Sequence, residues 1–232
     1  MRLKGKVAVV TGGSRGIGKA LAILLSREGA SVAIAARAKK NIDDVADLIK
    51  KSGGSAVGVE ADVSRPDDVK NLMKKTLDMF GRIDILINNA GVCVRKNIAE
   101  TSEREWDETI GTNLKGVFLC CREAVPVMIK QKSGIIINIS SGAGRYGFPG
   151  LSAYCASKFG VIGLTESLSR EFPERIKAYA ACPGGVDTEM HRRVFPEDDT
   201  SALDSPEDVA KKIVELCMPD CKIKSGEVVE LY

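Results

Sequence analysis

The sequence predicts an α/β domain in which helices cover both faces of a parallel sheet of seven strands. Short apolar runs alternate with helical patterns along all 232 residues, which is typical of consecutive strand–helix–strand units. The runs are continuously apolar rather than alternately polar, as expected for strands buried on both faces. No repeat, low-complexity tract or linker divides the chain. We therefore expect one domain over residues 1–232.

Each expected strand is a short run made up mostly of Val, Ile, Leu and Ala residues. The runs are Val7–Val10, Val32–Ala35, Ala56–Val59, Ile83–Ile87, Ile135–Ile139, Ala178–Ala181 and Glu227–Leu231. Helix starts lie between them. Ser102 and Glu105 form a capping-box pattern, and Ser64 and Ser205, each followed by proline in the first turn, are the other expected N-caps.

Composition argues against several classes of partner. The 34 basic and 31 acidic residues are interspersed and give a net charge of +3, so nothing indicates binding to nucleic acid or to an anionic membrane. No run approaches the roughly 18 apolar residues of a membrane span, and no signal-type segment follows the basic N-terminus. A cytoplasmic location is expected.

Cysteine and histidine usage limits the possible chemistry. The seven cysteines are odd in number and lack a repeated C-x-x-C spacing, so we expect reduced, mostly buried thiols. His191 is the only histidine, which leaves no metal site of the two- or three-histidine kind. A Ser-His-Asp triad would have to use it, and a loop or surface position is the expected one.

A glycine-rich turn, Thr11 to Gly18, follows the first strand and precedes the helical pattern Lys19–Arg27. Glycines 12, 16 and 18 allow a tight turn and close approach of a pyrophosphate to the helix N-terminus. The strand–turn–helix context predicts a dinucleotide site. A purely structural turn is the alternative.

The end of the second strand indicates which dinucleotide is bound. NAD sites usually place a carboxylate there, whereas a 2′-phosphate requires cationic donors. Here Arg37 follows the strand, with Lys39 and Lys40 beyond it, and Arg15 lies in the glycine turn. Two guanidinium groups suit bidentate contact with phosphate, so NADP(H) is predicted. The alternatives are a solvated basic stretch or a site that accepts either nucleotide.

Tyr154 and Lys158 are spaced i,i+4, which places them on one face of a helix expected from about Ser152 to Glu171. A neighbouring cation favours the phenolate and shifts a phenol toward acid/base work. Ser141, just past the fifth strand, has a hydroxyl that can bind a substrate oxygen. Taken alone, Tyr-x-x-x-Lys is common on amphipathic helices. The prediction of a catalytic pair therefore depends on its occurrence together with the other motifs of the chain.

The ordered motifs resemble the short-chain dehydrogenase/reductase family in its single-domain form. They are the glycine turn, Asn88-Asn89-Ala90-Gly91, Asn113, Ser141, Tyr154-x-x-x-Lys158 and Pro183-Gly184. The resemblance covers essentially the whole chain. It implies a Rossmann fold with a doubly wound seven-stranded parallel sheet, and transfer of a hydride between nicotinamide and a carbonyl or secondary alcohol.

The resemblance also implies residue roles. Tyr154 matches the general acid/base, Lys158 the residue that lowers its pKa and binds the nicotinamide ribose, and Ser141 the substrate-oxygen donor. Asn113 matches the asparagine that holds a water of the proton relay, unless it bonds within its own helix. The expected cofactor-binding residues are Gly12, Ser14, Arg15, Gly16, Ile17, Gly18, Arg37, Asp62, Val63, Asn89, Ala90, Gly91, Tyr154, Lys158, Pro183, Gly184, Val186 and Thr188; for Asp62 and Thr188, capping is the alternative.

The substrate is less well indicated. Residues 184–205 form a charged, weakly patterned stretch that we expect to be a substrate loop, with a plain surface connection as the alternative. Similarity to 3-oxoacyl-carrier-protein reductases favours a β-keto thioester, although the short segment after Thr188 would leave the pocket more open. An NAD-linked alcohol or sugar dehydrogenase and a non-catalytic NADP sensor are the other hypotheses. The family implies a homotetramer or homodimer.

Overall fold

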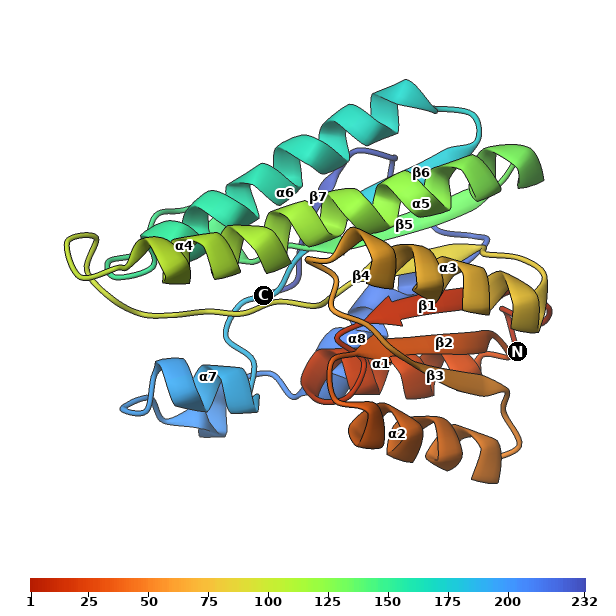
Figure 1. The fold of residues 1–232 in the computed structure, drawn as a ribbon, viewed down its shortest axis with the longest axis horizontal. Helices are drawn as coiled ribbons and strands as arrows, with labels where there is room; N and C mark the ends of the chain where they lie inside the picture. The colour runs from red at the N-terminus through yellow and green to blue at the C-terminus, as the bar shows by residue number, and fades with distance from the viewer.

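The computed structural model describes residues 1–232 and confirms the predicted sheet. All seven strands are parallel and lie in the order β3-β2-β1-β4-β5-β6-β7, so the winding reverses between β1 and β4 (Figure 1). The strands are β1 Val7–Thr11, β2 Ser31–Ala36, β3 Ala56–Glu60, β4 Ile85–Asn88, β5 Gly134–Ile139, β6 Ile176–Cys182 and β7 Val228–Glu230.

Helices cover both faces of the sheet. On one face α1, α2 and α8 pack over β1 and β2, and on the other α3, α5 and α6 pack together with α4 (Figure 1). The helices are α1 Gly16–Arg27, α2 Lys39–Lys51, α3 Pro66–Phe80, α4 Glu103–Ile110, α5 Gly116–Gln131, α6 Ser152–Glu171, α7 Glu189–Val194 and α8 Pro206–Glu215. None of them is long and apolar enough to cross a membrane.

Two apolar layers form the core because successive residues of each strand face opposite sides. In β1, Ala8 and Val10 contribute to the layer under α1 and α8, whereas Val9 contributes to the layer under α3 and α5. This is the physical reason for the continuous apolar runs. A strand with helices on both sides has no face on which a polar side chain is solvated.

The capping predictions were right at two sites and wrong at one. Ser102 makes the predicted capping box with Glu105, and the Ser205 hydroxyl accepts from the backbone N–H of Asp208. Ser64 does not cap α3, which begins after Arg65 without a side-chain cap. Its hydroxyl and backbone N–H both donate to the Asp62 carboxylate instead. The Ser64 hydroxyl therefore stabilises a local turn and does not cap the helix.

The carboxyl ends of the strands meet at one edge of the sheet, where the reversal between β1 and β4 opens a crevice. The segment from 184 to 205 lies above this edge. It contains the short helix α7 and a single bridge between Val186 and Asp204. Its path over the crevice places α7 opposite the glycine turn.

Candidate active site

A cavity of about 680 Å³ lies at the carboxyl edge of the sheet, a size typical of small-molecule and cofactor sites. It brings together residues from nearly every predicted motif. Gly18 and Asn113 are the two predicted residues that do not line it. Those that do are Gly12, Ser14, Arg15, Gly16, Ile17, Arg37, Asp62, Val63, Asn89, Ala90, Gly91, Ser141, Tyr154, Lys158, Pro183, Gly184, Val186 and Thr188.

The glycine turn has the geometry of a phosphate cradle. Gly12 and Gly16 have positive φ angles of 64° and 52°, which residues with a Cβ rarely adopt. A Cβ at Gly12 would lie 2.8 Å from the Cα of Ala90, and one at Gly18 would overlap the carbonyl oxygen of Gly12. Gly18 therefore allows close packing under the turn. These features fit a bound dinucleotide whose pyrophosphate meets the N-terminus of α1.

Asn89 ties the end of β4 to this cradle. Its side-chain amide donates to the carbonyls of Thr11 and Gly12 at 3.0 and 3.2 Å. The Thr11 hydroxyl accepts from the backbone N–H groups of Asn89 and Ala90 at 3.0 and 3.1 Å. Thr11 was not among the predicted site residues. Its buried hydroxyl holds two motifs together without lining the cavity.

Two cations face the nucleotide end of the cavity. Arg15 and Arg37 line it, whereas the Lys39 ammonium turns away to Asp43, 2.7 Å distant. The residue that follows β2 is Arg37 and not a carboxylate, although Glu108 of α4 lies 3.9 Å from it. Arg15 and Arg37 are therefore the cationic side chains that could contact a 2′-phosphate.

Lys158 is buried, and its Nζ donates to the carbonyl oxygen of Ile139 at 2.7 Å. Burial disfavours the charged form and lowers the pKa of Lys158 to about 8. The Ser140 hydroxyl donates to the Lys158 carbonyl at 2.9 Å, which anchors α6 to the end of β5. The ammonium lies 5.5 Å from the centre of the Tyr154 ring, so the helical spacing has produced the expected pair.

Tyr154 is half-buried and lines the cavity together with Ser141. Burial raises the pKa of its phenol above the ordinary value of 10, and the Ser141 hydroxyl opposes that rise. This direction is opposite to the one expected from a neighbouring ammonium alone. At neutral pH the protein holds Tyr154 as a protonated donor.

Asn113 lies in a turn of π-helix, Gly111–Lys115, between α4 and α5. Its amide does not bond within its own helix: Oδ1 accepts from the Val92 N–H, and Nδ2 donates to the Val92 carbonyl and to the Ser157 hydroxyl. A Cβ at Gly91 would lie 3.4 Å from Asn113 Oδ1 and 3.8 Å from Lys158 Nζ, so both side chains lie close to Gly91. Asn113 thus supports the wall that carries Tyr154 and Lys158 instead of facing the cavity.

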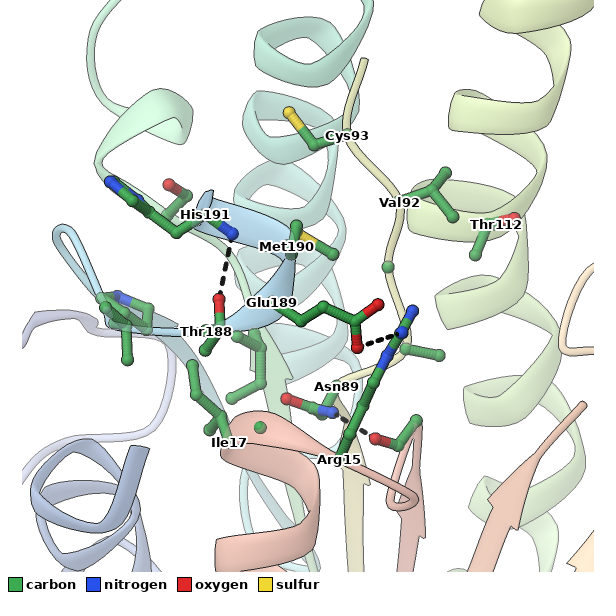
Figure 2. Close-up of a pocket in the computed structure, with 18 of the residues that line it drawn as sticks. Arg15, Ile17, Asn89, Val92, Cys93, Thr112, Thr188, Glu189, Met190 and His191 are labelled. Carbon is green, nitrogen blue, oxygen red and sulfur yellow. Dashed lines mark hydrogen bonds and ion pairs between the residues drawn. The ribbon is translucent and has the colours of Figure 1, made fainter. Parts of the chain in front are cut away.

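Several cavity residues were not predicted from the sequence. Figure 2 shows Cys93 and the α7 residues Glu189, Met190 and His191 around the cavity. His191 was expected in a loop or at the surface, but it lies in α7 with a side chain only 15% exposed, and its Nε2 is 2.9 Å from Asp198. For the α7 residues the available signal was their place in residues 184–205, the stretch expected to form a substrate loop.

Comparisons with known proteins find relatives that match almost the whole chain. The family model described as short chain dehydrogenase matches residues 6–199. The chain is 38% identical to the 3-oxoacyl-acyl-carrier-protein reductase FabG of Thermotoga maritima, over 99% of this chain and 97% of the relative. It is 37% identical to the FabG of Staphylococcus aureus, over 97% and 96%, and 40% identical to an uncharacterized oxidoreductase of Thermotoga maritima, over 92% and 82%.

Proposed function

The chain belongs to the short-chain dehydrogenase family, and we propose that it is an NADP(H)-dependent reductase that converts a 3-oxoacyl thioester to the 3-hydroxyacyl thioester. One observation carries the proposal: a single cavity has Ser141, Tyr154 and Lys158 at one end and the glycine cradle with two arginines at the other. The first group suits carbonyl chemistry, and the second suits a phosphorylated dinucleotide.

When bound, the nicotinamide cofactor supplies the hydride for the carbonyl carbon. Tyr154 donates its phenol proton to the carbonyl oxygen as charge develops there. The Ser141 hydroxyl donates a hydrogen bond to the same oxygen and fixes its position. The protonated form of Tyr154 that burial favours is the form required in this direction.

Lys158 serves the same step through charge. Its ammonium beside the Tyr154 ring stabilises the phenolate left after proton transfer. With a pKa lowered to about 8, Lys158 also exchanges protons readily near neutral pH. These properties support a role in returning the proton to Tyr154.

Two observations support the choice of substrate. Relatives that match almost the full chain are named 3-oxoacyl-acyl-carrier-protein reductases. The part of the cavity near Tyr154 is lined by apolar side chains that suit an acyl chain, namely Leu151, Met190, Val194 and Phe195. Location in the cytoplasm and assembly as a dimer or tetramer remain predictions.

Steady-state assays test the proposal. Acetoacetyl thioesters of acyl carrier protein and of coenzyme A, simple ketones, quinones and sugars are compared with NADPH and NADH. We expect the highest kcat/KM with a keto thioester and NADPH. Preferential turnover of a sugar or simple alcohol with NAD⁺ would contradict both the substrate and the cofactor. Bound NADPH that no carbonyl in the panel consumes would indicate a non-catalytic protein.

A further inference from the structure

Both arginines at the nucleotide end of the cavity face a glutamate. Arg15 Nη1 donates to Glu189 Oε2 at 2.6 Å, and Arg37 Nη1 lies 3.9 Å from Glu108 Oε1. We propose that Glu189, and more weakly Glu108, compete with the 2′-phosphate of the cofactor for these arginines and thereby limit the preference for NADPH over NADH. This inference rests on the proposed use of NADP(H).

The Arg15–Glu189 pair joins two segments on opposite sides of the cavity. Arg15 is the residue before α1, and Glu189 is the first residue of α7 (Figure 2). The segments are in close proximity, since a Cβ at Gly16 would lie 3.4 Å from the Thr188 side chain. The contact therefore spans the nucleotide end of the cavity and brings a carboxylate to a predicted phosphate site.

The pair is exchangeable. Both side chains are largely exposed, 58% for Arg15 and 68% for Glu189, and neither has another ion-pair partner. Exposed ion pairs are worth little, on the order of 0.2–1 kcal/mol. An incoming phosphate can therefore displace the carboxylate, but the displacement reduces the net gain in binding.

The competition acts on only one of the two cofactors. A guanidinium binds a carboxylate or a phosphate through the same planar donors, so Arg15 cannot serve both fully. A carboxylate left beside a doubly charged phosphate also repels it. A nucleotide without the 2′-phosphate leaves the ion pair in place. Glu189 thus weakens the binding of NADPH and leaves that of NADH unchanged.

The Arg37–Glu108 contact predicts a smaller effect. Its 3.9 Å separation is at the limit of an ion pair, and no hydrogen bond joins the two groups. Glu108 lies near the C-terminal end of α4 and borders the same nucleotide end of the site as Arg37 and Asp62. Glu108 should therefore weaken NADPH binding less than Glu189 does.

Titration calorimetry with 2′,5′-ADP and 5′-AMP tests the proposal without turnover, since these probes differ only in the 2′-phosphate. The Glu189→Gln variant should bind 2′,5′-ADP about two- to five-fold more tightly and 5′-AMP as the wild type does. Glu108→Gln should give a smaller change in the same direction. Fluorescence titration with NADPH and NADH should reproduce this ranking.

Glu215→Gln is the matched control for loss of one negative charge. Glu215, like Glu189, pairs with an arginine: it lies 2.7 Å from Arg2. Arg2 also contacts Glu28, which follows the C-terminal end of α1, whereas Arg15 precedes its N-terminal end. A 12-residue helix, about 18 Å long, therefore separates the control from the cavity. Its affinity for 2′,5′-ADP should equal that of the wild type.

A second variant assigns the effect to Arg15. In an Arg15→Met background, the Glu189→Gln change should tighten 2′,5′-ADP binding by less than it does with Arg15 present, because the contested guanidinium is absent and only the repulsion by the carboxylate is relieved. Unchanged or weaker binding in Glu189→Gln, with the wild type still preferring 2′,5′-ADP, would overturn this inference alone. A wild type without preference for 2′,5′-ADP over 5′-AMP would overturn the proposed cofactor and this inference with it.

Discussion

Asn113 holds the backbone of Val92 by both ends of its amide: the Val92 N–H donates to Oδ1 at 2.8 Å, and Nδ2 donates to the Val92 carbonyl at 2.9 Å. Nδ2 also donates to the Ser157 hydroxyl at 3.1 Å, which in turn donates to the Tyr154 carbonyl at 2.7 Å. One buried side chain thus connects the segment after β4 to the helix that carries Tyr154.

Replacing Asn113 by alanine should lower both stability and activity. The change leaves two partly buried backbone groups of Val92 without their partner, and the free energy of unfolding should fall by about 1–3 kcal/mol. The turnover number should fall as well, because α6 loses a restraint near Tyr154. Chemical denaturation and steady-state assays measure the two effects. Asn97→Ala, at an exposed position of the same segment, is the control. An unchanged denaturation midpoint would contradict the bridging role.

Replacing Tyr154 by phenylalanine should remove turnover and keep nucleotide binding. The ring still fills its place beside Leu151 and Cys93, but no proton is available to the carbonyl oxygen. We expect kcat to fall roughly 10²- to 10⁴-fold with little change in the affinity for NADPH. Stopped-flow hydride transfer and fluorescence titration measure these quantities. Near-normal turnover would refute the role of the phenol.

Elements built from local pattern were predictable from the sequence. The helix Ser152–Glu171 has the expected bounds, and each apolar run became a strand. The run Ile83–Ile87 is shifted, because β4 begins at Ile85. The backbone N–H and carbonyl of Ile83 bond to the Gln131 side chain at 3.0 and 2.8 Å. A side chain 48 residues away thus replaces the sheet ladder, and no local pattern reveals that.

The site residues that belong to sequence motifs were predictable. The contacts between segments far apart in the sequence were not. The cavity gathers most motif residues, since parallel strands end at one edge of the sheet. The contact between Arg15 and Glu189 joins residues 174 positions apart. The place of His191 likewise depends on how residues 184–205 cross the cavity. The direction of the Tyr154 pKa was missed because burial, which the sequence does not display, is the largest influence on the phenol and raises its pKa.

Lys158 should impose a pH dependence on stability that a neutral side chain lacks. An unfolded lysine keeps its proton up to about pH 10.5, whereas the pKa of folded Lys158 is about 8. Between these values the unfolded chain binds more protons, so the free energy of unfolding rises with pH; below pH 8 the full penalty of burying the charge is present. From pH 7.5 to 9.5 the wild type should gain about 1–2 kcal/mol relative to Lys158→Met. Denaturant titrations at both pH values measure this, with the exposed Lys130→Met as control. If the difference in free energy of unfolding between the wild type and Lys158→Met is the same at both pH values, the lowered pKa of Lys158 is contradicted.

Replacing Gly12 by alanine should destabilise the protein and abolish nucleotide binding. The φ angle of 64° is unfavourable for alanine, and the new Cβ would press on the Cα of Ala90. We expect a loss of about 1–3 kcal/mol in the free energy of unfolding. Gly147→Ala is the matched control, because its Cβ meets nothing within 4 Å and its φ angle is not positive. Thermal unfolding and NADPH titration compare the two variants. Equal stability and equal NADPH affinity in both would contradict the role of Gly12 in the phosphate cradle.

Replacing Arg37 by aspartate should move the cofactor preference toward NADH. Aspartate repels a 2′-phosphate and accepts hydrogen bonds from a ribose 2′-hydroxyl, so the change weakens one cofactor and assists the other. Hydrogen bonds to charged groups are worth about 1.5–3 kcal/mol, and the NADPH/NADH ratio of kcat/KM should fall at least about tenfold. Lys40→Asp makes the same charge change on an exposed residue that does not line the cavity. If both variants shift the NADPH/NADH ratio equally, the shift comes from the change in surface charge and not from a contact of Arg37. If neither variant shifts it, Arg37 does not contact the phosphate.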